Sequence, residues 1–140
     1  MSREPIYLET PLYAEDVKAL KTGDVVRLYG VLYAARDAAH ARMVEAIERG
    51  LRGMVGKGAR SEEVLEAMRM HGCVYFGAVE GTAALLADCV KEAEVIAYPH
   101  LGTEAVRRLV VEDVPVVVIN DLYGGDLYRE GRERWRRPFV

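Results

Sequence analysis

The sequence predicts an α/β fold in which a mixed and largely parallel sheet is covered by helices, within a single domain over residues 1–140. Two observations lead to this fold class. Strand-like apolar runs alternate with helix-like segments along the chain, and the runs at 73–79 and 114–120 are almost wholly apolar. A strand that is buried on both faces gives such a continuous run, because helices cover both sides of its sheet. A length of 140 residues is typical of one domain.

In the first half of the chain the expected elements alternate strictly. They are a strand at 5–9, a helical turn at 15–20, a turn and strand at 23–34, a helix over 35–49, and a strand leading into a glycine loop at 53–58. Gly50 stands just past the last turn of the 35–49 helix, where glycine commonly ends a helix.

In the second half the alternation continues. We expect a helix over 62–70, a strand at 73–79, a helix over 81–93, a strand at 94–98, a helix over 102–109, a strand at 114–120, and a turn or hairpin at 121–128. Ser61 is a suitable N-cap for the 62–70 helix, and Glu62 and Glu63 suit its first turn. Gly72 is expected to end it.

Composition excludes several classes of protein. The net charge of −3 gives no reason to expect nucleic-acid binding, and no apolar run is long enough to cross a membrane. The N-terminus does not resemble a signal peptide, so we expect a cytoplasmic protein. Cys73 and Cys89 have no metal or redox spacing and are expected to be buried thiols. The chain has no Gln and a single Asn, and Arg greatly outnumbers Lys. These features suggest a thermophile, although the Arg excess could equally reflect genome composition.

The first candidate binding residues lie where the 23–34 strand meets the following helix. Arg36 stands in the first helical turn, where the macrodipole disfavours a cation. Arg36 and His40 are spaced i,i+4 and so share a helix face, and Asp37 and His40 are spaced i,i+3. A guanidinium beside free backbone N–H groups suits a carboxylate ligand. A surface ion pair of Arg36, with His40 as an ordinary helix residue, explains the same pattern.

The second candidate is Lys57, which stands between Gly56 and Gly58 after an apolar strand. The stretch does not fit the phosphate-loop motif, because Leu51 stands at its first glycine position and Gly58 at its Ser/Thr position. A lysine on a glycine turn suits capture of a small anion as a point charge. A solvated loop lysine is the alternative. No set of residues has metal-ligand spacing, so no metal site is expected.

Taken in order, four stretches resemble the β subunit of class I fumarases and the related tartrate dehydratases. They are GDVVRLYGVLYAARDAAHARM at 23–43, LRGMVGKGARSEEVLEAM at 51–68, VYFGAVEGTAALLA at 74–87 and the segment 93–128. The run R-D-A-A-H followed by G-K-G is the most specific part. The resemblance implies a swivelling β/β/α domain in a lyase of the hydro-lyase type. It would add water reversibly across the double bond of a dicarboxylate, with fumarate and L-malate (tricarboxylic acid cycle) placed before tartrate.

The resemblance also implies partners and roles. A partner α subunit, or fused domain, would carry a four-iron four-sulfur cluster held by three Cys, and this chain alone would bind no cofactor. Arg36 and Lys57 would bind the substrate carboxylate, while Asp37 or His40 would orient Arg36. We expect a homo- or hetero-oligomer, with aromatic anchors among Tyr98, Tyr123, Tyr128 and Trp135.

One stretch of the family is missing. A segment with the motif G-P-T-T-x-x-R-M-D, which supplies a catalytic Thr and a further substrate Arg, normally lies between the R-D-x-x-H helix and the G-K-G strand. Here residues 44–50 join 51–58 directly. No general base is therefore predicted, and two hypotheses remain. The chain is either a subunit of an iron–sulfur hydro-lyase or a shortened non-catalytic homologue that acts as a dicarboxylate-binding or assembly module.

Overall fold

The computed structural model describes residues 4–34, 40–56, 58–78, 87–97 and 106–135. Their helices and strands are β1 (Ile6–Glu9), α1 (Ala14–Lys18), β2 (Val25–Ala34), α2 (His40–Glu48), β3 (Gly53–Gly56), α3 (Glu62–His71), β4 (Val74–Ala78), β5 (Val90–Ala97), β6 (Val106–Asn120) and α5 (Leu127–Trp135). Within these ranges, none of the helices combines the length and the apolar character that crossing a bilayer requires.

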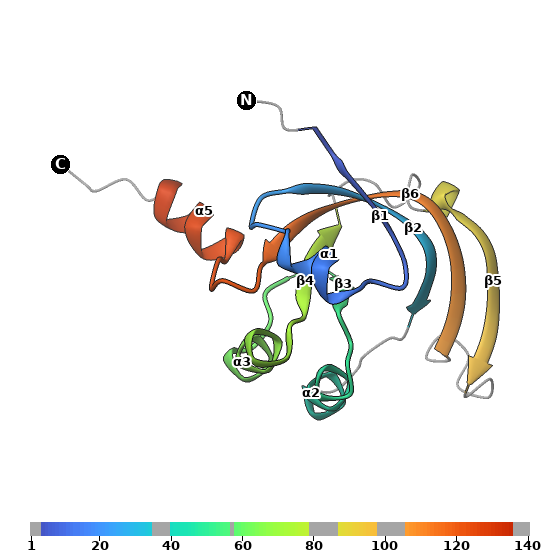
Figure 1. Ribbon diagram of the computed structural model, residues 1–140, viewed down its shortest axis with the longest axis horizontal. Coiled ribbons are helices and arrows are strands. Elements are labelled where there is room, and N and C mark those ends of the chain that lie inside the picture. The colour runs from blue at the N-terminus through green and yellow to red at the C-terminus, as the bar shows by residue number, and fades with distance from the viewer. Residues whose placement is uncertain (1–3, 35–39, 57, 79–86, 98–105, 136–140) are drawn as a thin grey trace.

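The strands form one mixed sheet in the order β1-β2-β6-β4-β3, and β5 also pairs with β6 (Figure 1). The pairs β1–β2 and β3–β4 are parallel, whereas β6 is antiparallel to β2, β4 and β5. The α/β class and the mixed sheet are confirmed. The expectation of a largely parallel second half is wrong, because β6 returns through the centre of the sheet against its neighbours.

Strand β6 changes partners halfway along its length. Its first half pairs with β5 and with the end of β2, and its second half pairs with the start of β2 and with β4. The β2–β6 register shifts between Leu28 and Gly30, opposite Asp113, which has a left-handed φ of 56°. Asp adopts this conformation more readily than most residues do. In Figure 1, β2 and β6 bend over together, with β5 beyond β6.

The C-terminal ends of two expected helices are strands instead. Residues 106–109, expected to end a helix, belong to β6, and residues 90–93, expected to end the 81–93 helix, begin β5. The remainder of those two predictions is described only at 87–89, which are helical. Residues 107–111 pair with β2 on one side and β5 on the other. This pairing outweighs the local helix preference of the segment.

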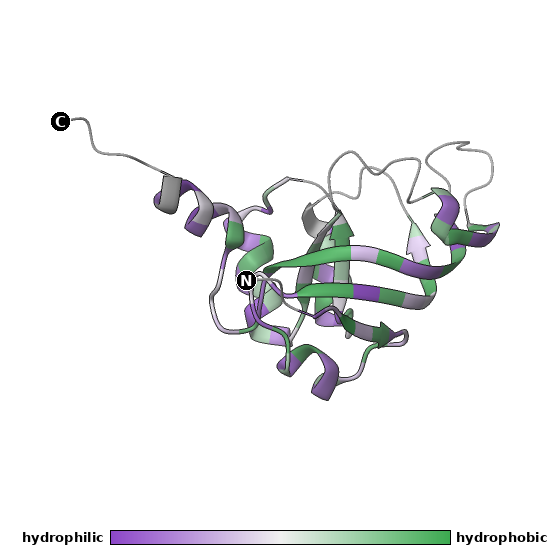
Figure 2. Cartoon of the chain, turned by 90° about the horizontal axis from the view of Figure 1, so that it is seen from above, coloured by the Kyte–Doolittle hydropathy of each residue, from purple (hydrophilic) through white to green (hydrophobic). Residues whose placement is uncertain are grey.

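The apolar runs are buried on both faces, as expected. In β4, Val74 and Phe76 join one core cluster while Tyr75, between them, joins the other. Alternate residues of a strand point to opposite faces, so the clusters lie on the two sides of the sheet. Val17 of α1 packs in the first cluster, and residues of α2, α3 and α5 pack in the second. Figure 2 shows long hydrophobic stretches along the strands, broken by hydrophilic residues.

The ends of the helices follow their sequence signals. Ser61 caps α3, and its hydroxyl oxygen accepts a hydrogen bond from Val64 N at 3.3 Å. Gly72 ends α3 in the left-handed conformation. The expected strands at 5–9, 23–34, 53–58, 73–79 and 114–120 and the helical turn at 15–20 are confirmed, with shifts of a few residues at their ends. The expected 35–49 helix is confirmed from residue 40, and its first five residues lie outside the description.

A close approach fixes the turn after β1. The Thr10 hydroxyl donates to the Val31 carbonyl at 2.9 Å and accepts from Val31 N at 2.7 Å. Gly30 makes this possible, because a Cβ there would overlap Thr10 Oγ1 and its φ is +113°. These two hydrogen bonds hold the turn after β1 against the middle of β2.

Candidate functional site

Most of the sequence-predicted site lies outside the described residues. Arg36, Asp37 and Lys57 are not described, and His40 is described only as the first residue of α2, without its side chain. Gly56 ends β3, and Gly58 follows with a φ of +78°. The structure therefore describes the two glycines on either side of Lys57, but not the predicted cationic side chains themselves.

The strand order determines where the segments that carry Arg36 and Lys57 leave the sheet. Strands β2 and β3 run in the same direction, because both belong to the set that β6 opposes. They are not adjacent, since β6 and β4 lie between them. Gly56 is level, through β4 and β6, with Val25 at the start of β2. The end of β2 at Ala34 is roughly 30 Å further along the strand.

This separation between the end of β2 and the end of β3 limits how Arg36 and Lys57 can bind the same ligand. Residues after β2 and β3 reach one ligand only if the bend of β2 brings its end back towards β3, or if a second chain completes the site. Figure 1 shows that β2 does bend strongly along its length.

The glycine loop after β3 is held by two side chains, Arg60 and Tyr75. The Tyr75 hydroxyl donates a hydrogen bond to the Gly58 carbonyl at 2.8 Å. The Arg60 guanidinium lies over the Tyr75 ring, with Cζ 4.4 Å from the ring centroid. A Cβ on Gly56 would come within 2.5 Å of Arg60 Nη2. The two glycines that flank Lys57 in sequence are thus both in contact with the Arg60–Tyr75 pair.

Two opposing effects act on the pKa of the Tyr75 hydroxyl. Burial raises the pKa of Tyr75, and the positive charge of Arg60 offsets part of that increase. The phenol therefore stays protonated at neutral pH and remains a donor. Arg60 Nε is buried and has no hydrogen-bond partner among the described residues.

Neither Arg60 nor Tyr75 was predicted from the sequence as a site residue. Arg60 follows Lys57 by three residues in the stretch GKGARS, which was a usable signal for a second cation near the loop. Tyr75 carries the polar atom in the run CVYFGAV, but nothing in the sequence says that its hydroxyl reaches the loop.

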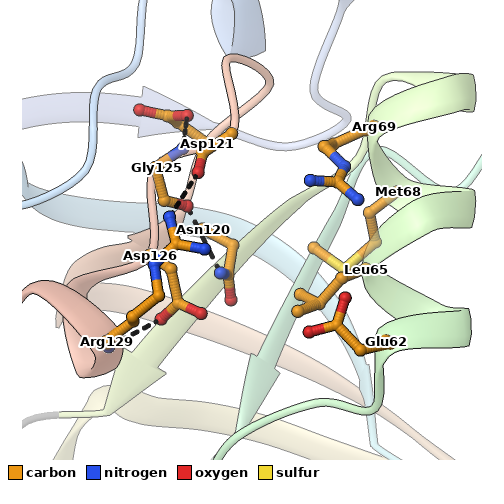
Figure 3. A pocket seen from close by; sticks show the side chains of 10 residues that line it. Glu62, Leu65, Met68, Arg69, Asn120, Asp121, Gly125, Asp126 and Arg129 are labelled. Atoms are coloured by element: carbon orange, nitrogen blue, oxygen red, sulfur yellow. Dashed lines mark hydrogen bonds between the residues drawn. The ribbon is translucent and has the colours of Figure 1, made fainter.

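A second candidate site is a small open hollow, with a cavity volume of about 30 Å³, between α3 and the turn that follows β6 (Figure 3). Its lining residues are Glu62, Leu65, Met68, Arg69, Asn120, Asp121, Gly124, Gly125, Asp126 and Arg129. Charged groups of both signs face it, so the hollow has no clear preference for an anion or a cation.

Much of the polar chemistry in this hollow is already used by the fold. The Asp121 carboxylate accepts hydrogen bonds from Tyr123 N at 2.8 Å, from Gly125 N at 2.9 Å, and from the backbone N–H and the hydroxyl of Thr22. Burial alone would raise the pKa of Asp121, but these donors lower it below its ordinary value. Arg129 Nη2 donates to the Gly124 carbonyl at 3.3 Å. These polar groups of the hollow therefore stabilise the turn that follows β6.

The cysteines do not fit a shared iron–sulfur cluster. Both cysteines are buried and neither forms a disulfide, as expected from the sequence. They belong to different core clusters on opposite faces of the sheet, and burial raises the pKa of Cys73 to about 12. Among the described residues, no group of three His, Cys, Asp or Glu side chains could hold a metal ion.

The predicted aromatic anchors have different surroundings. Tyr123 is 58% exposed, with its hydroxyl donating to the Lys18 carbonyl and Lys21 Nζ 3.5 Å above its ring. Tyr128 packs against the second core cluster. The side chains of Tyr98 and Trp135 lie outside the description. Tyr123 is therefore the one anchor that the described surface offers.

The comparisons with known proteins agree on one family. The profile described as "Fumarase C-terminus" matches residues 2–51 and 47–131. Fumarate hydratase 2 of Leishmania major is 33% identical over 89% of the chain, and the anaerobic class I fumarate hydratase of Escherichia coli is 41% identical over 55%. These alignments cover 22% and 14% of the two enzymes. A Methanocaldococcus jannaschii protein, named as a candidate beta subunit of L(+)-tartrate dehydratase, is 28% identical, and the alignment covers 89% of the chain and 91% of that protein.

The matches also locate the missing segment. The profile aligns in two parts that meet at residues 47–51, between α2 and β3. The alignment with the M. jannaschii protein spans 178 positions, more than the 140 residues of this chain. The relative therefore holds residues for which this chain has no counterpart, which agrees with the gap seen in the sequence.

Proposed function

Because the chain belongs to the family of fumarase C-terminal domains, we propose that it is the β component of a class I hydro-lyase. The proposed reaction is the reversible addition of water to a dicarboxylate, with fumarate and L-malate as the first substrate pair and tartrate as the second. The observation that carries the proposal is the family match over most of the chain, which includes the R-D-A-A-H and G-K-G stretches.

In this proposal the chain supplies cations to the substrate. Arg36 provides a planar guanidinium that can hold a carboxylate with two hydrogen bonds, and Lys57 provides a point charge on its glycine loop. Asp37 or His40 orients Arg36, and Gly56 and Gly58 give the loop its shape. The four-iron four-sulfur cluster that the family resemblance implies belongs to the partner α subunit, since the cysteines of this chain do not fit it.

A second candidate function is favoured by the two-part profile match, whose parts overlap at residues 47–51. A chain without the G-P-T-T-x-x-R-M-D segment lacks the catalytic Thr that the family resemblance implies. Such a chain would bind a dicarboxylate, or support assembly, without turning the substrate over.

The experiment that separates these functions is co-expression with the candidate α subunit, followed by anaerobic purification. We expect a complex that hydrates fumarate, mesaconate or another member of a dicarboxylate panel. The α subunit purified alone is the control, and it should be inactive. An inactive complex that still binds dicarboxylate would favour the second function, and a chain that forms no complex and binds no dicarboxylate would contradict both.

A further inference from the structure

Arg60 has an unusual environment for an arginine. Its Nε is the only buried side-chain nitrogen or oxygen atom without a hydrogen-bond partner in the described part of the chain. A buried donor without a partner costs roughly 1–3 kcal/mol, so such a group in a native protein needs an explanation, such as a bound water, an ion or a functional role. The described ion pairs join Arg27 to Asp113, Arg49 to Glu45 and Arg108 to Glu94, so no described carboxylate neutralises Arg60.

The position of the Arg60 guanidinium is nevertheless fixed. It stacks on the Tyr75 ring, and its Nη2 occupies the space that a side chain at position 56 would fill. A stacked guanidinium keeps its N–H groups at the edge of its plane, where they can bind a carboxylate with two hydrogen bonds. The same Tyr75 holds Gly58 through its hydroxyl. Arg60 is thus a restrained cation without an acidic partner among the described residues, close to Gly56 and Gly58.

We propose that Arg60 binds a carboxylate of the dicarboxylate substrate, together with Lys57. This inference rests on the proposed function and adds a contact residue to it. A dicarboxylate carries two negative charges, and a preorganised guanidinium binds a carboxylate at little further entropic cost. The bound carboxylate would supply the acid that Arg60 lacks.

The test compares variants of the co-expressed α–β complex by isothermal titration calorimetry with succinate and with butyrate. Arg60→Met keeps an unbranched apolar stem and removes the guanidinium charge. Arg132→Met is the matched control, since Arg132 is an exposed arginine on α5. We expect Arg60→Met to weaken succinate binding by tenfold or more and butyrate binding by less than twofold. Arg132→Met should leave the binding of succinate unchanged.

The opposing outcomes are distinct. Equal weakening of succinate and butyrate binding would mean that Arg60 only positions the loop, and unchanged succinate binding would mean that it has no part in the site; either result overturns the inference. Arg60→Lys, with circular dichroism melting, covers the case in which Arg60→Met fails to fold, and should lose at least threefold in succinate affinity. A wild-type complex that binds succinate through Arg60 but hydrates no dicarboxylate would defeat the proposed function and leave this inference standing.

Discussion

The Asp121 carboxylate accepts two hydrogen bonds from Thr22, at 2.9 Å from the backbone nitrogen and at 3.0 Å from the hydroxyl. The two residues are 99 positions apart in sequence. This contact joins the turn before β2 to the turn after β6. Gly125 lets the turns approach, because a Cβ there would overlap Thr22 Oγ1.

Replacing Asp121 with Asn should lower the free energy of unfolding at neutral pH by about 2 kcal/mol, because charge-assisted hydrogen bonds are lost. The folded pKa of Asp121 is lowered, so its contribution is fully present above the unfolded pKa of roughly 4 and is lost as the pH falls through the folded value. Urea unfolding from pH 7 to pH 2 should show the gap between variant and wild type closing below about pH 4. Asp126→Asn is the control, since Asp126 accepts one backbone bond from Arg129 at 3.2 Å. A gap that stays constant down to pH 2 would contradict this account.

Gly30→Ala should destabilise the fold by about 3 kcal/mol or more, because φ is +113° and the new Cβ would overlap Thr10 Oγ1. Gly23→Ala is a matched control, with φ of +91° and open space around the Cβ, and should cost about 1–2 kcal/mol. Thermal unfolding of both variants measures the difference. Equal losses would show that the approach of Thr10 adds nothing to the backbone strain.

Arg36→Lys and Lys57→Ala should each reduce kcat/KM of the assembled complex at least tenfold, roughly 1.4 kcal/mol of transition-state stabilisation. Arg36→Lys keeps the charge but loses the planar fork, so it tests geometry. The Tm should change little, because a cation that serves a ligand contributes little to the fold. Normal turnover together with a large fall in Tm would assign these residues a structural role.

Cys73 should resist alkylation in the folded protein. Burial raises its pKa to about 12, so almost no thiolate exists at pH 7.5, and the thiolate is the reactive form. Iodoacetamide labelling followed by mass spectrometry should find Cys73 modified at least 100-fold more slowly than in urea-unfolded chain. Comparable rates in the two states would mean that the region around Cys73 opens readily.

The sequence predicted the elements whose signals are local. Ser61 and Gly72 mark both ends of α3, and the runs around Val74 and Val116 mark strands buried on both faces. Residues 106–109 of β6 were predicted as the end of a helix, because Glu104, Arg107 and Arg108 favour a helix over a strand in isolation. Their strand conformation depends on pairing with β2, which lies far away in sequence, and with the preceding β5.

The candidate site, like the fold, was predictable from the sequence only where its signals are local. Lys57 and its flanking glycines form a visible pattern, and Arg36 is conspicuous at a helix start. The role of Arg60 depends on a tyrosine ring 15 positions further along, which only the folded chain brings beneath it. The order of the strands, which separates β2 from β3, likewise has no local signal.

The central position of β6 has a consequence for biosynthesis. When the ribosome has released the chain only as far as β5, the parallel pairs β1–β2 and β3–β4 exist without the strand that joins them. Nascent chains in this state present open strand edges of the kind that promote aggregation or recruit chaperones. Premature termination before residue 106 should therefore yield insoluble fragments. Completion of the sheet requires pairings between residues far apart in sequence, such as Val25 with Val117. Such long-range pairings should make folding slow for a chain of this size.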